Sequence, residues 1–192
     1  MVMDGDIERV LWTEEEIAGR VAELAAQISD DFQRFPSPVV VVGVATGAFL
    51  FLADIVRKIT IPIVVDFIRV ESYGSGTESN GSPIISCDLK VDVSGKHVIV
   101  VEDIVDTGNT ISCLNSHLMS KGASSISVCA LLNKPARRRV PFKLAGEGKF
   151  YSGFECPNHF VVGYGLDFAE LYRNLSYIGV LKSEKYNQAE EN

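Results

Sequence analysis

Three carboxylates lie close together directly after a run of β-branched residues in the middle of the chain. They are Glu102, Asp103 and Asp106, and four small or polar residues follow them, namely Thr107, Gly108, Asn109 and Thr110. Carboxylates accept hydrogen bonds from vicinal hydroxyls such as those of ribose, and they hold Mg²⁺ through water. Free backbone N–H groups at the start of a helix bind phosphate. The segment therefore predicts a site for a sugar phosphate with a metal ion.

The same residues also have a simpler interpretation. Glu102 and Asp103 could be solvated side chains at the end of a strand, with Asp106 as a helix cap. Their position favours a binding site, because ligands of open α/β sheets bind beyond the carboxyl ends of the strands. The turn lacks the lysine of a Walker A loop, and no GxGxxG sequence follows a strand, so a generic Rossmann nucleotide-binding protein is disfavoured.

These residues need a framework of strands and helices to bring them together. Continuous runs of Val and Ile alternate with helical patterns, which is typical of a parallel sheet covered on both faces. We expect strands at residues 39–42, 63–70, 84–91, 97–101 and 125–132, strand-like pieces at 149–154 and 160–164, and helices at 13–28, 49–59 and 110–121. A capping box at Thr13 and Glu16 predicts the start of the first helix, and Gly122 predicts the end of the third.

The predicted fold class is therefore α/β, with a mostly parallel central sheet flanked by helices. We expect one domain over residues 1–192. Its core is expected at about residues 36–140. A small hood over one end of the sheet is expected from about residues 1–35 and 141–192.

Composition excludes several classes of protein. The chain has 192 residues, 46% of them hydrophobic, and a net charge of −7. A general nucleic-acid binder is disfavoured, because phosphate neutralisation needs clustered Lys and Arg. We expect no membrane span, because the uncharged stretch 35–53 contains two prolines and two glycines. We also expect no targeting signal, and therefore a cytoplasmic protein. The four cysteines and three histidines match no metal-site spacing and are expected in structural or surface positions.

The sequence VVEDIVDTGNT at residues 100–110 resembles the motif with which type I phosphoribosyltransferases bind phosphoribosyl pyrophosphate (PRPP). Further segments resemble the hypoxanthine-guanine branch of that family. They are VGVATGAFLFLADIVR, VDFIRVESYGSGT, LLNKPARRR and GFECPNHFVVGYGLDFAELYRNLSYIGVL. The likeness runs from about residue 7 to residue 181, and it implies the type I phosphoribosyltransferase fold.

The resemblance implies a reaction in purine salvage. Enzymes of this family displace pyrophosphate from PRPP with hypoxanthine or guanine, give IMP or GMP, and use Mg²⁺. Glu102 and Asp103 would then bind the ribose hydroxyls and the metal, and Asp106 would face purine N7 as the acid/base group. The 5′-phosphate would be held by Thr107, Gly108, Asn109 and Thr110. Since adjacent strand residues point to opposite faces, Glu102 and Asp103 reach one ligand only if the strand already turns there.

The resemblance also implies three purine-binding residues. Lys134 offers only donors, so it suits the purine O6 and opposes the 6-amino group of adenine. Phe160 matches the aromatic residue that stacks on the base, and Val161 matches a residue whose backbone meets the base edge. The alternatives are a surface position for Lys134 and core positions for Phe160 and Val161. We expect a solvated face or a subunit contact from the neighbouring run Arg137, Arg138 and Arg139.

The pyrophosphate and metal sites follow from the same resemblance. The loop with Thr46 and Gly47 matches the pyrophosphate loop, although many family members carry Lys in place of Thr46. Arg173 matches a cation that contacts pyrophosphate, which suits a fork of donors facing phosphate oxygens. Asp167 matches a metal-site carboxylate. Residues 71–83 are expected to form a mobile loop that closes over the active site and excludes water, with the motif Ser72, Tyr73 and Gly74.

Alternative functions stay open at this point. Xanthine, adenine or a pyrimidine could replace the expected base, and xanthine is the hardest to exclude because it shares the 6-oxo group. A regulator that keeps the fold and binds RNA is a further class, which the acidic composition disfavours. The expected partners are PRPP, hypoxanthine, guanine, IMP, GMP and pyrophosphate, with further copies of the chain in a homodimer or homotetramer.

Overall fold

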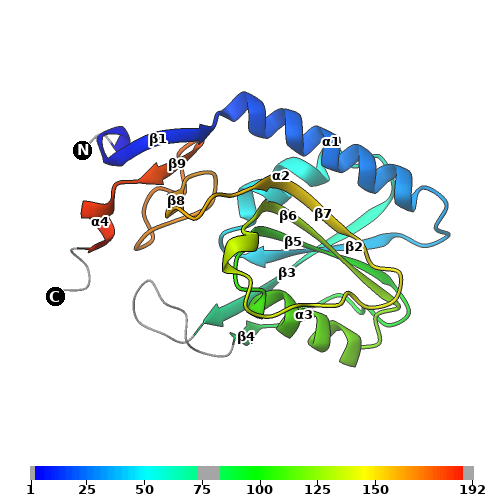
Figure 1. Cartoon of the computed structure of the whole chain (residues 1–192). Coiled ribbons are helices and arrows are strands. Elements are labelled where there is room, and N and C mark those ends of the chain that lie inside the picture. The colour runs from blue at the N-terminus through cyan, green and yellow to red at the C-terminus, as the bar shows by residue number, and fades with distance from the viewer. Residues whose placement is uncertain (1–2, 73–82, 188–192) are drawn as a thin grey trace.

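A six-stranded sheet forms the centre of the molecule, which is a computed structural model that describes residues 3–72 and 83–187 (Figure 1). Its strands are β2 (Val39–Ala45), β3 (Ile63–Ser72), β4 (Pro83–Cys87), β5 (His97–Val105), β6 (Ser125–Asn133) and β7 (Phe150–Glu155). Their order is β4-β3-β2-β5-β6-β7, and all neighbours are parallel except β3 and β4. The predicted α/β class with a mostly parallel central sheet is confirmed.

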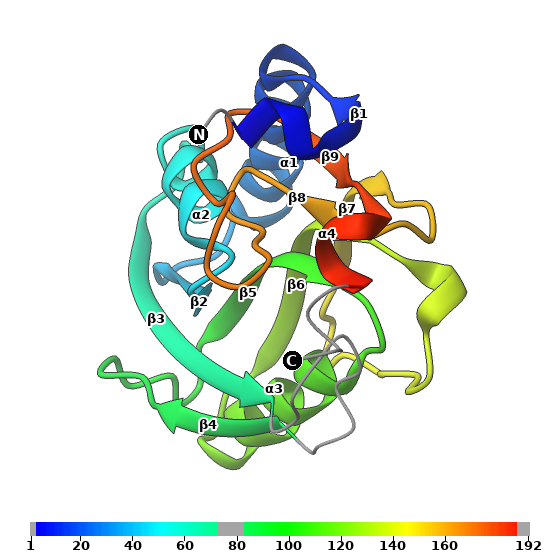
Figure 2. The same cartoon turned by 90° about the vertical axis from the view of Figure 1, so that its left-hand side faces the viewer.

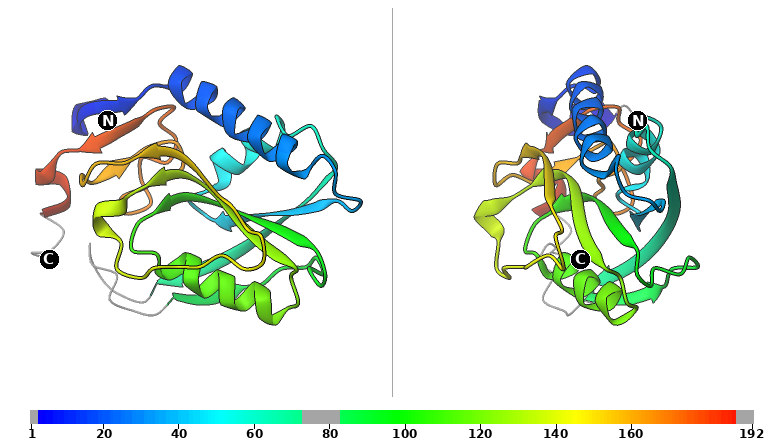
Figure 3. Two further views of the ribbon diagram at one scale, coloured as in Figure 1. Left: turned by 45° about the vertical axis from the view of Figure 1, so that its right-hand side comes forward. Right: turned by 90° about the vertical axis from the view of Figure 1, so that its right-hand side faces the viewer.

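Helices cover both faces of this sheet, which explains why its central strands β2 and β5 are rich in Val and Ile. The helices α1 (Glu14–Phe32) and α2 (Phe49–Val56) lie on one face, and α3 (Asn109–Ser120) lies on the other (Figure 3). Val39 and Val41 pack beneath α1 and α2, whereas Val40 and Val42 pack on the side of α3. β2 therefore buries both of its faces, as is typical of a parallel strand inside a sheet.

The predicted helix ends are confirmed at two positions. The Thr13 backbone N–H donates to Glu16 Oε2 over 2.8 Å and the Glu16 N–H donates to Thr13 Oγ1 over 3.3 Å, which completes the capping box of α1. At the end of α3, the amides of Gly122 and Ala123 donate to the carbonyls of Met119 and Leu118, which is a Schellman motif.

A second, three-stranded sheet covers the end of the main sheet where its parallel strands finish (Figure 2). It contains β1 (Ile7–Trp12), β9 (Ile178–Leu181) and β8 (Val161–Val162), and we call it the hood together with the short helices η1 (Met3–Asp6) and α4 (Ser183–Asn187). The hood thus combines segments near both ends of the chain. Its expected bounds need correction, because α1 packs on the main sheet and β7 is a strand of that sheet.

Several strands differ from the expected bounds where they approach the hood. β5 continues to Val105 instead of ending at residue 101, because it stays paired with β6 through Ile104 and Leu132 and through Val105 and Asn133. β2 likewise reaches Ala45, while β4 and β8 are shorter than expected. Ser72 ends β3, and Tyr73 and Gly74 lie outside the described residues, so the mobile loop stays a prediction. No helix in the described part of the chain is long and apolar enough to span a membrane.

Candidate active site

Two carboxylates at the end of β5 meet beneath the hood. Glu102 is buried, and its Oε2 atom has no hydrogen-bond partner. Asp103 Oδ1 accepts from the Ile104 backbone N–H over 2.7 Å. β5 loses its regular alternation here, because Val101 and Ile104 both pack in the cluster beneath α1 and α2. This irregularity lets adjacent carboxylates approach each other, so Glu102 lies inside the sheet rather than solvated beyond its end.

Burial disfavours the ionisation of both carboxylates. Burial, and then the charge of Asp103, raises the pKa of Glu102 well above its usual value. Burial also raises the pKa of Asp103, although its contact with Glu102, the Ile104 amide and the charge of Arg173 offset part of that effect. A pair of this kind titrates as a unit. The arrangement attracts a cation or a donor-rich ligand, because either would relieve the repulsion.

The turn after β5 is held in the shape of an anion site. Gly108 is the N-cap of α3 with φ of 90°, and a Cβ at this position would collide with the Val140 carbonyl. The Thr107 carbonyl accepts from the amides of Arg139 and Val140, both over 3.0 Å. The first amides of α3 have no carbonyl partner within the helix and point out of its N-terminus. The residues predicted to bind phosphate therefore lie together, with a backbone that can approach an anion closely.

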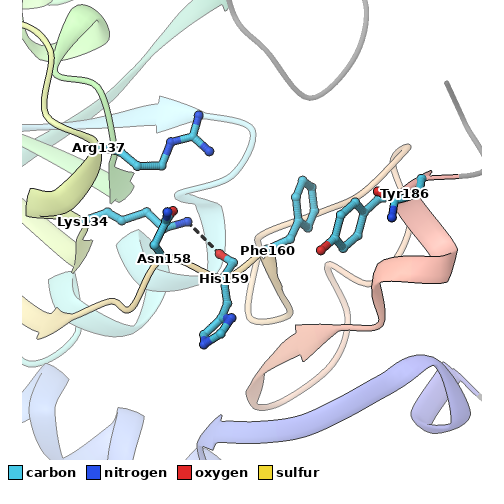
Figure 4. Close-up of a pocket in the computed structure, with 7 residues that line it drawn as sticks. Lys134, Arg137, Asn158, His159, Phe160 and Tyr186 are labelled. Carbon is cyan, nitrogen blue, oxygen red and sulfur yellow. Dashed lines mark hydrogen bonds between the residues drawn. The ribbon is translucent and has the colours of Figure 1, made fainter.

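A cavity of about 250 Å³ lies between the segment after β6, at residues 134–137, and the hood (Figure 4). Lys134 is buried and donates from Nζ to the His159 carbonyl over 2.7 Å, so a surface position for Lys134 is wrong. Burial lowers the pKa of Lys134, against the opposing effect of Cys156 and Asp106. The cavity lining consists of Lys134, Arg137, Asn158, His159, Phe160, Tyr186 and Asn187.

Phe160 and Val161 take different positions although they are adjacent. Phe160 lines the cavity, where its ring meets the ring of Phe168 edge-on at a centroid distance of 5.5 Å. Val161 is buried in β8 opposite Val180 of β9, so its side chain belongs to the core. The alternative of a core position is therefore confirmed for the side chain of Val161, and the role of its backbone at the base stays a prediction.

The arginine run contributes to the cavity, because two of its partly exposed members contact other residues of the chain, and the expected subunit contact stays a prediction. The turn η2 (Pro135–Arg137) places Arg137 in the cavity lining, with Nε 3.3 Å from Asp106 Oδ1. Arg138 donates to Asn133 Oδ1 over 2.6 Å and covers the ring of Phe142. Only Arg139, among these three residues, is exposed.

The loop between β2 and α2 lies directly against the carboxylates. Its Ala45–Thr46 peptide bond is cis. A Cβ at Gly47 would collide with the Asp103 carboxylate, so only glycine allows this approach. Arg173 donates to the Gly165 carbonyl over 2.8 Å and pairs with Asp167 over 2.9 Å. The predicted pyrophosphate cation and metal carboxylate are therefore partners of each other.

Comparison with known proteins decides the family of this chain. Residues 12–169 match the model of the phosphoribosyl transferase domain. The chain belongs to the phosphoribosyltransferase family. The resemblance found in the sequence is therefore confirmed.

The phosphoribosyltransferases most useful for comparison match almost the whole chain. Hypoxanthine phosphoribosyltransferase of Haemophilus influenzae is 43% identical over 177 residues, which cover 92% of this chain and 96% of the relative. Hypoxanthine-guanine phosphoribosyltransferase of Mycobacterium tuberculosis is 44% identical over 186 residues, which cover 95% and 90%. The crystal structure of a hypoxanthine phosphoribosyltransferase from Staphylococcus aureus superimposes with a TM-score of 0.87 at 41% identity and covers 97% of both chains. This match confirms the type I phosphoribosyltransferase fold.

The sequence analysis did not predict five residues of the cavity lining, and two of them, Arg137 and Tyr186, contact predicted site residues through their side chains. Arg137 follows Lys134 by one short turn, and that spacing could have indicated a shared cavity. Tyr186 offered no such signal, because it reaches the cavity only through the docking of α4 beside β9 in the hood (Figure 2).

Proposed function

We propose that this phosphoribosyltransferase converts hypoxanthine and guanine, with PRPP, to IMP and GMP and releases pyrophosphate, in purine salvage. The observation that carries the proposal is the buried ammonium of Lys134, which faces one cavity together with the ring of Phe160 and with Arg137, the ion-pair partner of Asp106. The relatives named hypoxanthine or hypoxanthine-guanine phosphoribosyltransferase support the same assignment.

The purine binds in this cavity between a stacking ring and two charged groups. Phe160 supplies the apolar face, and the backbone of Val161 meets the edge of the base. Lys134 Nζ, which donates to the His159 carbonyl in the free protein, donates to the purine O6 in the complex, because both oxygens are acceptors. Adenine carries a donor amino group at this position and leaves the ammonium unpaired. Asp106 lies at N7, where its carboxylate stabilises the proton as the bond to ribose forms.

PRPP binds along the turn and loops beside the cavity. The amides and hydroxyls of residues 107–110 hold the 5′-phosphate at the start of α3, and Glu102 and Asp103 accept from the ribose hydroxyls. Pyrophosphate lies between the loop of Thr46 and Gly47 and the guanidinium of Arg173. Thr46 keeps a hydroxyl donor and brings no charge, so Arg173 is the cation that faces the leaving group.

The carboxylates fit a magnesium ion that arrives with its substrate. Glu102 Oε2 is buried without a hydrogen-bond partner and Asp103 lies beside it, so the two side chains offer hard oxygen donors at one place. Within residues 3–72 and 83–187, no three acidic, His or Cys side chains form a closed metal cage. Mg²⁺ usually binds one or two carboxylates and completes its shell with water and phosphate oxygens. When bound, the ion would neutralise developing charge on pyrophosphate, and Asp167 would be a third carboxylate able to hold it.

The test is a product assay with PRPP, Mg²⁺ and each base in turn. We expect IMP and GMP from hypoxanthine and guanine, and little AMP from adenine. Faster turnover of adenine than of hypoxanthine would exclude the role of Lys134, and faster turnover of xanthine would change the assigned base. Retention of RNA at physiological salt without any product would instead support a regulator.

We also propose that the protein self-associates as a homodimer or homotetramer and acts in the cytoplasm. Val65 and Phe67 lie on one face of β3 with 41% and 48% of their surface exposed, which suits a contact between copies. The four cysteines are free thiols, which suits a reducing compartment. Light scattering with size-exclusion chromatography, repeated on a Phe67→Lys variant, tests the association.

A further inference from the structure

The ring of Phe160 rests on a tyrosine from the C-terminal end of the chain. Tyr186 of α4 stacks on Phe160 with the ring centroids 5.0 Å apart and the planes 23° from parallel. In Figure 4, Phe160 lies between Tyr186 on one side and Lys134 and Arg137 on the other. One face of the Phe160 ring is thus covered by Tyr186, and the other faces the two cationic side chains of the cavity.

The helix that carries Tyr186 is fastened to the opposite end of the chain. Lys185 pairs with Asp6 over 2.8 Å, and the Lys182 amide donates to the Asp6 carbonyl over 3.0 Å. Lys182 Nζ also donates to the Gly5 carbonyl over 2.7 Å. Tyr172 donates its hydroxyl to the second carboxylate oxygen of Asp6, over 3.0 Å. A five-residue helix is unstable alone, so these contacts with η1 determine where Tyr186 lies.

We propose that Tyr186 is a positioning residue for the purine, which backs the ring of Phe160 and fixes the plane on which the base stacks. Phe160 directly precedes a strand of only two residues, so the hood backbone alone gives its ring little support. A ring held in place before the ligand arrives loses less conformational entropy on binding. The identity of the ligand as a purine rests on the proposed function, whereas the support of Phe160 by Tyr186 does not.

Steady-state kinetics with hypoxanthine and PRPP varied separately test this role. An aromatic pair contributes about 0.5–1.5 kcal/mol, so Tyr186→Ala should raise KM for hypoxanthine about two- to tenfold. KM for PRPP should stay unchanged, because the turn that we place at its 5′-phosphate, residues 107–110, lies at the start of α3 and not beside Tyr186 on α4. Tyr186→Phe should restore the wild-type KM for hypoxanthine, since the ring and not the hydroxyl makes the stack.

Two more variants separate position from general stability. Asp6→Asn keeps Tyr186 but weakens the ion pair with Lys185, so it should raise KM for hypoxanthine less than Tyr186→Ala does. Glu184→Gln changes an exposed residue of the same helix and should leave both KM values unchanged. An unchanged KM for hypoxanthine in a folded Tyr186→Ala protein, or an equal rise in KM for PRPP, would overturn the proposal.

Fluorine NMR of protein labelled with 4-fluorophenylalanine provides a readout without activity. The Phe160 resonance is assigned by its loss in Phe160→Leu. We expect this resonance to shift and broaden in Tyr186→Ala and to keep its position in Tyr186→Phe and Glu184→Gln. An unmoved Phe160 resonance in Tyr186→Ala would contradict the support of Phe160 by Tyr186, whatever the activity of the protein. A wild-type protein that made no IMP would contradict only the proposed function.

Discussion

Arg137 Nε lies 3.3 Å from Asp106 Oδ1, and both side chains are about one-third exposed. Arg137 lines the cavity. The pair connects the turn after Lys134 with the turn after β5, which are the two segments that must act on one base. An ion pair of this exposure contributes little to stability. Its importance is that it orients the carboxylate that we place at purine N7.

Removal of the Arg137 side chain should lower kcat/KM for hypoxanthine modestly. For Arg137→Ala we expect kcat/KM for hypoxanthine to fall about two- to fivefold, because a partly exposed ion pair contributes about 0.2–1 kcal/mol. Arg139→Ala is the matched control, since Arg139 is exposed in the same run, and it should leave kcat/KM unchanged. Equal losses in the two variants would mean that the positive charge of the whole run matters rather than the contact with Asp106.

Substitution of the acid/base residue should have a much larger effect. Asp106→Asn keeps the shape of the side chain and removes its ability to hold the proton at N7. General acid–base groups typically contribute about 10²–10⁴ in rate, so kcat should fall by a factor in this range. PRPP binding, measured by calorimetry with Mg²⁺, should be nearly unchanged because the phosphate turn is intact. Near-normal turnover would remove Asp106 from the mechanism.

The choice of base should depend on Lys134. Gln at this position can donate or accept at the purine 6-position, so Lys134→Gln should reduce the preference for hypoxanthine over adenine. We expect kcat/KM for hypoxanthine to fall about ten- to hundredfold, the size of a lost charge-assisted hydrogen bond. The ratio of kcat/KM for the two bases is the measurement. A ratio equal to that of the wild type would show that another group selects the base.

In the ligand-free protein, the buried Glu102 carboxyl should lower the free energy of unfolding. The pKa of Glu102 is raised well above 4.5 in the folded state, so the buried group resists ionisation. Stability is then lost as pH rises from about that value through the folded-state pKa, because the unfolded chain releases the proton first. Glu102→Gln should therefore increase the free energy of unfolding by about 1 kcal/mol or more at pH 8 and by little at pH 4.5, while activity falls.

Urea unfolding at both pH values measures this difference. Glu147→Gln, at an exposed position, is the control and should change neither value. A lower free energy of unfolding for Glu102→Gln than for the wild type at pH 8 would contradict this prediction. It would mean that the Glu102 carboxylate is stabilised by a partner within the folded protein.

Local signals in the sequence were sufficient for much of this structure. The capping box of Thr13 and Glu16 and the left-handed Gly122 depend only on nearby residues, and both are confirmed. β5 ends at Val105, and not at residue 101 as the sequence predicts, because its last residues pair with β6. The carboxylates in this segment give no sign of that pairing. A charged residue at the end of a strand looks solvated in sequence, and only the fold shows that Glu102 is buried.

The residues that were missed depend on contacts between distant segments. Arg137 is one of three consecutive arginines, and nothing in their order distinguishes the one that faces Asp106 from the exposed Arg139. Tyr186 reaches Phe160 only because α4 docks on η1 through Asp6, so both ends of the chain determine the cavity wall. Such long-range docking is not encoded in any short pattern.

The central claim is that one cavity, between Lys134 and Phe160, and one turn, at residues 107–110, together bind a purine nucleotide. A crystal structure of the protein with IMP and Mg²⁺ tests this claim most directly. We predict the base stacked on Phe160 with O6 at Lys134 and N7 at Asp106, and the 5′-phosphate on the amides at the start of α3. A fully bound IMP whose base or phosphate lies elsewhere would contradict the account.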